Sequence, residues 1–336
     1  MANTYGDISP RTAAYAAAGL LERALPEMVA ARFGQTRPVP KNKSQTIKFR
    51  RYNGFPVSVT PLTEGVTPSA DNISATDVTA VLSQYGRRTG LTDVIADTHE
   101  DPVLQEYTTI MGELGGQTQE TILWNVIKAG TNVMFANGAA RNAVSTGITA
   151  DTLRRALRQL KRNNTKQITN MLRASTSVAT QPIPRSFVAF CHPDLEKDLQ
   201  GLPGFIRPQN YATAGVLAPS EIGTFEQIRF LTSTIYTPFI QAGAAVAAAG
   251  TMLSNSVANA ANGLADVYPI VIVGMDAYAS VPLAGKDSIT PIVLNPNNPS
   301  DSDPLGQRGH VGFKFYTTAV ILNDAWMVRV ETGVAA

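Results

Sequence analysis

Residues 305–331 of the chain read LGQRGHVGFKFYTTAVILNDAWMVRVE, and this stretch decides how the fold is completed. Glycines lead into a first run rich in β-forming and aromatic residues, among them Phe313, Phe315 and Tyr316. Asn323 and Asp324 interrupt this run, and Trp326, Val328 and Val330 then alternate with Met327, Arg329 and Glu331. Two such runs around a turn signal predict a closing β-hairpin whose second strand has one buried face. The stretch contains no obvious catalytic residue, so we interpret it as a packing element.

The composition of the whole chain limits the classes of function that it can have. The chain has 336 residues, 44% of them hydrophobic and 16% charged, and its formal net charge is +2. This length can form two or three hydrophobic cores. The small net charge predicts no general affinity for polyanions. A charged content below the usual value of about 25% fits a surface largely covered by neighbouring molecules, although many soluble enzymes are similar.

Cysteine content and hydropathy restrict the environment of the protein. Cys191 is the only cysteine, which excludes an intrachain disulfide and a cysteine-based zinc site. The apolar runs are too short to span a bilayer, and the first ten residues lack the pattern of a signal peptide. We therefore expect no membrane partner and expect the protein to be made and to remain in the cytoplasm of the producing cell.

Periodicity predicts a mixed α and β chain. Residues 11–33 favour a helix that Pro26 kinks, and 34–45 favour an extended arm. Residues 46–92 favour a long, open β-hairpin that is too poor in large side chains to form its own core. Helices are predicted over 101–130 and 150–163, and long loops over 241–264 and 285–309. Strands are predicted around 187–190, 228–231, 268–273 and 277–281.

One helix face carries a candidate binding site. The helix predicted over 150–163 has an apolar face and an opposite face made of Arg154, Arg155, Arg158, Lys161 and Arg162. Such a face can contact the phosphates of a nucleic acid without reading its sequence. It can equally be a solvated helix surface, or a set of ion pairs between subunits. Both interpretations remain open at this stage.

No residue pattern indicates an enzyme. His99, His192 and His310 are far apart and lack the spacing of a metal site, and no phosphate-binding loop or nucleophile motif occurs. His192-Pro193-Asp194 matches a tripeptide of J-domain cochaperones, but a proline near a helix start explains it better. We interpret Cys191 as a small buried residue at a strand end. The sequence thus predicts no catalytic residue, no metal and no cofactor, and it disfavours a soluble hydrolase.

Four segments, in order, resemble the major capsid (coat) protein of tailed bacteriophages, in particular the branch typified by phage N-four. They are RSFVAFCHPDLEKDL (185–199), EIGTFEQIRFLTST (221–234), VYPIVIVGMDAYASVPL (267–283) and the closing stretch 305–331. The resemblance covers nearly the whole chain. It implies an α+β chain with the Hong Kong 97-like phage capsid fold.

The resemblance also implies a domain organisation. Residues 1–45 would form an N-terminal arm, and 46–97 an extended loop. Residues 98–150 and 301–336 would form a peripheral domain with a long spine helix. Residues 151–300 would supply the rest of that domain and an axial domain, with a variable loop at 241–264.

The implied function is structural. The chain would assemble into the hexamers and pentamers of an icosahedral virion shell in the host bacterial cytoplasm. The shell would enclose double-stranded DNA, with the basic helix face as the only visible contact. Portal, scaffolding and decoration proteins are further partners that the resemblance allows. The alternative is an encapsulin-like shell, which would share the fold but enclose cargo enzymes.

Overall fold

The computed structural model describes most of the chain from residue 28 onward. The described residues are 28–98 except for scattered positions between 56 and 69, and then 103–168, 172–173, 181–182, 184–211, 216, 218–245, 263–285, 289, 291–296, 299 and 303–335. Most of the helix predicted over 11–33, His99 and most of the loop predicted over 241–264 lie outside these residues. In the part that is described, no helix is both long enough and apolar enough to cross a membrane.

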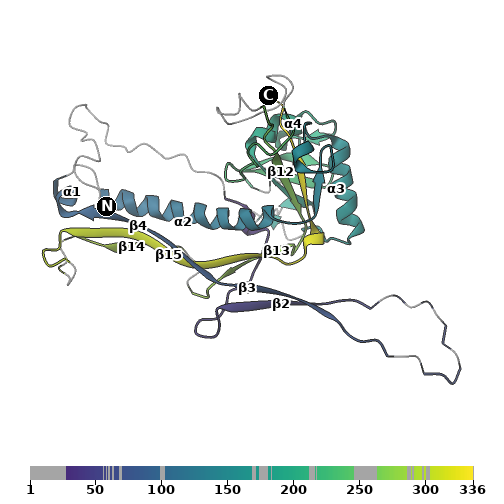
Figure 1. The fold of residues 1–336 in the computed structure, drawn as a ribbon, viewed down its shortest axis with the longest axis horizontal. Helices are drawn as coiled ribbons and strands as arrows, with labels where there is room; N and C mark the ends of the chain where they lie inside the picture. Colours follow the sequence, from purple (N-terminus) through teal and green to yellow (C-terminus); the bar gives the residue numbers. More distant parts are fainter. Residues whose placement is uncertain are drawn as a thin grey trace.

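A long helix and a narrow sheet form the elongated half of the molecule (Figure 1). The helix α2 (Val103–Lys128) follows the short α1 (Asp93–Thr98) and confirms the prediction over 101–130. Beside it, the strand β15 (Arg308–Ile321) pairs with β4 (Ser83–Thr92) on one side. On its other side β15 pairs with β13 (Tyr278–Pro282) and β14 (Pro291–Leu294), and β1 (Gln35–Thr36) pairs with β13. The buried side chains of Val311, Phe313 and Phe315 pack against α2.

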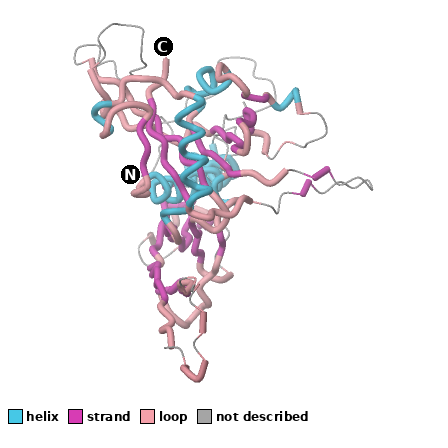
Figure 2. Tube along the Cα trace, turned by 90° about the vertical axis from the view of Figure 1, so that its right-hand side faces the viewer, coloured by secondary structure: helices cyan, strands magenta, loops and turns pink. Residues whose placement is uncertain are grey.

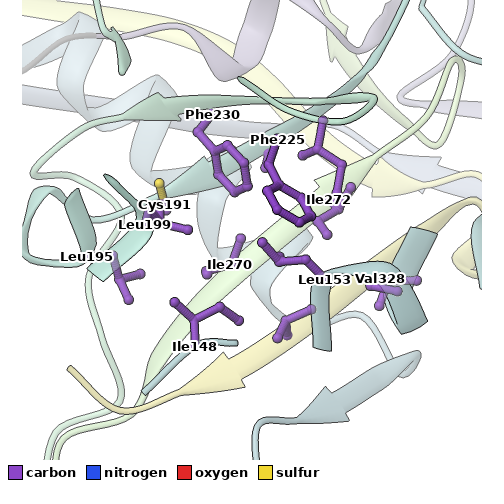
Figure 3. Packing of buried hydrophobic residues seen from close by; sticks show 14 of the residues in the cluster. Ile148, Leu153, Cys191, Leu195, Leu199, Phe225, Phe230, Ile270, Ile272 and Val328 are labelled. Atoms are coloured by element: carbon purple, nitrogen blue, oxygen red, sulfur yellow. The ribbon is translucent and has the colours of Figure 1, made fainter. Parts of the chain in front are cut away.

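A seven-stranded sheet forms the compact half. Its strands, in spatial order, are β5 (Val133–Phe135), β16 (Met327–Thr332), β12 (Tyr268–Val273), β8 (Phe187–Cys191), β11 (Ile228–Thr232), β10 (Glu221–Phe225) and β9 (Phe205–Ile206). The helix α3 (Ala150–Arg162) contributes Leu153, Ala156, Leu157 and Leu160 to the core on one face. Leu195 and Leu199, at the start of and within the short helix α4 (Glu196–Gln200), join this core, parts of which Figure 3 shows.

The C-terminal part of α2 covers the opposite face of the same sheet. There Leu123, Trp124 and Ile127 pack with Val271 and Val273 of β12, in a second buried cluster. Because both faces are covered, the central strands β8 and β12 are buried at every position. Burial on both faces explains their nearly continuous runs of apolar residues. The helix α2 therefore connects the two halves of the molecule.

A two-stranded hairpin leaves the molecule at the junction of the two halves (Figures 1 and 2). The strands β2 (Thr46–Tyr52) and β3 (Ala75–Val81) pair antiparallel, from Thr46 opposite Val81 to Tyr52 opposite Ala75. This pairing confirms an open hairpin over 46–81, whereas residues 83–92, predicted as part of the same hairpin, form β4 and pair with β15. Short elements complete the described chain: η3 (Ala30–Arg32), η4 (Arg141–Ala143), β6 (Leu172–Arg173), β7 (Gln181–Pro182), η5 (Pro193–Leu195), η6 (Pro208–Asn210) and η8 (Asp324–Trp326).

The predicted closing hairpin over 305–331 is wrong, because its two strands belong to different sheets. β15 lies in the five-stranded sheet, whereas β16 lies between β5 and β12 in the seven-stranded sheet. Between them, Asn323 caps η8, and Asp324 accepts hydrogen bonds from the backbone N–H of Thr131. The turn is thus held against the end of α2, and the chain crosses to the other sheet instead of folding back.

The burial predicted for the second strand is also wrong. Every residue of β16 is buried, with Val328 and Val330 in the α3-side core and Met327 in the α2-side core. Trp326 lies in η8 rather than in a strand and is half-buried. A further correction concerns the loop predicted over 285–309, since β14 forms within it. The isolated run Pro291–Leu294 becomes a strand because β15 offers it a partner edge.

Candidate functional site

The basic helix face predicted from the sequence forms as expected on α3. The hydroxyl of Thr149 accepts a hydrogen bond from the Thr152 N–H and caps the helix. The apolar side of α3 is buried, and all five predicted cations are exposed on the other side: Arg154, Arg155, Arg158, Lys161 and Arg162. The structure therefore brings these residues together on one accessible face.

Two of the five cations are paired within the chain. Arg154 Nε lies 2.8 Å from Glu226 Oε1, and its guanidinium lies 5.6 Å from the Phe225 ring centre. Arg155 Nε lies 3.3 Å from Asp151 Oδ2, four residues earlier. Among the described residues, none forms an ion pair with Arg158, Lys161 or Arg162. The last two turns of α3 thus present three cations that are free to contact an external anion.

Apolar side chains are exposed along the hairpin and the segment that joins its strands. Between residues 52 and 73, seven large ones of the described part are between 52% and 90% exposed: Tyr52, Phe55, Val57, Val59, Leu62, Val66 and Ile73. Single exposed apolar residues are ordinary, but a group confined to one projecting segment is typical of an interaction surface. A two-stranded hairpin is also marginally stable by itself in water.

A groove of about 350 Å³ lies at the root of the hairpin. It is lined by β1, β2 and β3 together with the turns near Asp276 and Trp326. Arg50 Nε and Nη2 each lie 2.8 Å from a different oxygen of Asp77, and the pair lowers the pKa of Asp77 to about 2. The Arg51 guanidinium lies 5.8 Å from the Trp326 ring centre. The groove thus combines cations with aromatic and aliphatic side chains.

A buried carboxylate attaches the first described residues to α2. Glu120 is 3% exposed, and its Oε1 accepts hydrogen bonds from Val29 N at 3.1 Å and Ala30 N at 2.8 Å. The hydroxyl of Tyr236 donates to the same oxygen at 2.9 Å, and burial beside this carboxylate raises the pKa of Tyr236. The hydroxyl of Tyr278 donates to Ala30 O at 2.5 Å. This anchor was not predicted from the sequence, in which an isolated acid near the apolar end of a long helix was the available signal.

A second buried network joins the end of α2 to β16. Glu331 is fully buried, and Arg141 donates to both of its oxygens at 2.8 Å, while Arg329 Nε lies 2.8 Å from Oε1. Arg329 also donates to the backbone oxygen of Lys128 at the end of the helix. Burial and the two neighbouring guanidinium groups lower the pKa of Lys128. Arg329 and Glu331 were expected on the face of the strand opposite to the buried Val328 and Val330, so this network was not predicted from the sequence.

The structure supports the interpretation of Cys191 as a buried residue at a strand end and of His192-Pro193-Asp194 as the start of a helical turn. Cys191 is fully buried at the end of β8, and burial raises the pKa of its thiol, which keeps it protonated. His192 caps η5 by accepting a hydrogen bond from the Asp194 N–H, and Pro193 begins that turn. Burial lowers the pKa of His192, although Asp194 opposes this shift. Within the described ranges, no group of three histidine, cysteine or acidic side chains could hold a metal ion.

Comparison with known proteins gives consistent results. The family model described as phage capsid protein matches residues 75–282. The major capsid protein of Pseudomonas phage KPP21 is 21% identical over 229 residues, which is 64% of this chain but only 56% of that relative. The capsid of Ralstonia phage GP4 is similar in structure, with a TM-score of 0.68 at 12% identity over 100% of this chain and 98% of the other.

An encapsulin is similar to a lesser degree. The holo-encapsulin complex of Synechococcus elongatus gives a TM-score of 0.51 at 10% identity, covering 93% of this chain and 92% of the other. At such identities, structural similarity establishes the fold and no more. The α+β phage capsid fold predicted from the sequence is therefore confirmed.

Proposed function

Because this chain belongs to the phage capsid protein family, we propose that it is the major structural subunit of a phage head. Copies of the chain assemble into hexamers and pentamers, and these close into an icosahedral shell around double-stranded DNA. The observation that carries this proposal is the projecting hairpin with its seven exposed apolar side chains, attached to a body of the capsid fold. Portal, scaffolding and decoration proteins join the same assembly, which forms in the host bacterial cytoplasm.

We expect other copies of the same chain to cover the exposed side chains of the hairpin. The exposed apolar side chains between Phe55 and Ile73 are not covered by the described part of the chain, since β2 and β3 project from the junction of its two halves (Figure 1). When one surface of a subunit binds a different surface of the next copy, repeated contacts close into rings if the rotation allows it. Many modest contacts repeated over a shell then give a stable assembly through avidity.

The proposal assigns roles to the parts of the chain. Residues 1–45 are the N-terminal arm, 46–97 the extended loop, and 98–150 with 301–336 the peripheral domain, with α2 as its spine helix. Residues 151–300 supply the rest of this domain and the axial domain, including the variable loop 241–264. β15 lies in the five-stranded sheet and β16 in the seven-stranded sheet, so both halves depend on the last segment of the chain.

The basic face of α3 is the proposed contact with DNA. Three cations without described partners can bind phosphates independently of base sequence. We expect the triple change Arg158→Glu, Lys161→Glu and Arg162→Glu to reduce the DNA retained by heads, while empty shells still assemble. The matched control replaces the same three residues by glutamine, which removes charge without reversing it and should give an intermediate loss. Full DNA retention in the glutamate variant would exclude α3 as a DNA contact.

The competing function is an encapsulin-like compartment that encloses cargo enzymes. The encapsulin-like function is less well supported, since the structural similarity to the encapsulin is lower and the matching family is one of phage capsids. The contents of purified particles discriminate between the two: a high ratio of absorbance at 260 nm to 280 nm indicates a genome, whereas a co-purifying enzyme indicates cargo.

Electron microscopy of the purified protein in negative stain tests the shared part of both functions. Rings of subunits or closed shells are expected at micromolar concentration. A protein that remains monomeric across the salt, pH and crowding conditions that promote assembly would refute the shell function.

A further inference from the structure

Charge is segregated along the hairpin. Residues 37–52, which approach and form its first strand, contain six cations and no acid: Arg37, Lys41, Lys43, Lys48, Arg50 and Arg51. Residues 53–74, which form the distal part, contain two acids, Glu64 and Asp71, and no cation. The root of the hairpin is therefore positive and its tip is negative, so opposite ends of two copies attract each other.

The groove at the root has the chemistry to receive an acidic and apolar segment. Arg37 and Arg51 line it, and neither has an ion-pair partner among the described side chains. Asp276 also lines the groove, but the cations outnumber it. The half-buried rings of Phe49 and Trp326 supply an apolar floor. Asp77 is already occupied by Arg50 and Lys48, which leaves Arg37 and Arg51 for an external carboxylate.

The tip presents the complementary groups. Leu62 and Val66 are 78% and 62% exposed, and Glu64 lies between them, next to a turn at Gly65 with φ of +77°. An acid flanked by two exposed aliphatic side chains matches a groove in which cations border an aromatic floor. Such a combination of buried apolar contact and charge pairing is usual at specific protein interfaces.

We propose that the root groove of one copy binds the hairpin tip of a second copy. In this contact Glu64 lies against Arg37 and Arg51, and the two aliphatic side chains lie against Phe49 and Trp326. The inference rests on the proposed shell function and specifies one of its subunit contacts.

The hairpin tip of a second copy is a better occupant of the root groove than the tip of the same chain. At about 3.3 Å per residue, the chain from Tyr52 to Glu64 spans up to about 40 Å. The hairpin projects away from its own root (Figure 1), so a tip can reach that groove only by folding back on itself. The tip and the groove are different surfaces, and their contact is head-to-tail, which produces rings of subunits. A nucleic acid is less suited to the groove, because its apolar floor would lie against phosphates.

A charge exchange tests the contact in the full-length protein. Glu64→Arg and Arg51→Glu should each reduce the fraction of protein that sediments as shells by about tenfold, since like charges then face each other. The double variant restores the opposite pair and should recover at least half of the wild-type yield. Lys166 is exposed and lies outside both the groove and the basic face of α3; Lys166→Glu changes the net charge as much as Arg51→Glu does, and its shell yield should equal that of the wild type.

Tryptophan fluorescence supplies an independent measurement. The chain has two tryptophans, and Trp124 is fully buried, so quenching by acrylamide reports on Trp326 in the groove. Quenching should fall severalfold when unassembled subunits form shells. If shells form but both single variants assemble normally and Trp326 remains equally quenchable, the groove contact is refuted and the shell function stands. If the wild type forms no shells at all, the shell function itself fails. Loss of retained DNA without loss of assembly in Arg51→Glu would assign the groove to nucleic acid instead.

Discussion

Replacing Glu120 by alanine should release the beginning of the described chain from α2. The change removes the acceptor of three hydrogen bonds, from Val29 N, Ala30 N and the hydroxyl of Tyr236. Val29, Ala30 and Tyr236 are all fully buried, so water cannot replace the lost acceptor without opening the cluster. Each buried donor left without a partner costs about 1–3 kcal/mol.

Together, the three donors left without a partner should lower the free energy of unfolding substantially. Relief of the buried carboxylate's own desolvation offsets part of the sum, and we expect a net loss of about 3–5 kcal/mol in the free energy of unfolding. Domains are stable by only about 5–15 kcal/mol, so the variant should be severely destabilised. Glu120→Gln keeps a neutral acceptor of nearly the same shape and should cost about 1–2 kcal/mol. Tyr236→Phe removes only one donor and should cost about 1 kcal/mol.

Urea unfolding of unassembled subunits measures these differences. Trp124 is a suitable reporter, since it lies one helical turn after Glu120 and its ring centre is 4.6 Å from that of Tyr236. Trypsin supplies a local readout, because cleavage after Arg32 requires η3 to open. We expect Glu120→Ala to accelerate that cleavage by about two orders of magnitude. A loss below about 1 kcal/mol together with unchanged cleavage would show that Glu120 does not hold this segment.

Three further outcomes follow from single positions. Gly223→Ala should destabilise the protein by about 2–4 kcal/mol, because φ is +152° there and a Cβ would lie 2.5 Å from Ile206 O. In contrast, a Cβ at Gly112 in α2 would meet nothing within 4 Å, so Gly112→Ala should stabilise the protein by about 1 kcal/mol. Thermal unfolding compares the two variants. The pKa of Asp77 is lowered to about 2, so its contribution to the hairpin is present above pH 4, roughly, and is lost as the pH falls toward 2, which carboxyl NMR titration can follow. Cys191 is fully buried and its pKa is raised, so it should react with a thiol reagent only after urea unfolds the subunit, and rapid labelling of the native protein would contradict its burial.

The helices and the long hairpin were predictable because their signals are local. The apolar spacing along 103–128 and 150–162 specifies α2 and α3 without reference to the rest of the chain, although the cap of α3 proved to be Thr149 and not Asp151, the residue expected from the sequence. The hairpin of β2 and β3 follows from alternating side chains around a segment that contains the turn signals Asn53-Gly54 and Glu64-Gly65. The five cations of α3 lie on one face because helical periodicity alone determines which residues share a face.

What the sequence determined by itself was therefore the type of most elements, the basic face of α3 and the relationship to phage capsid proteins. Only the tertiary structure decided that β15 and β16 separate into two sheets and that Glu331 is buried with two arginines. It also decided that Glu120 anchors the chain near residue 30, 90 positions away. The physical reason is that a strand's partner, and the cost of burying a charge, depend on groups that are distant in sequence and are brought close by folding.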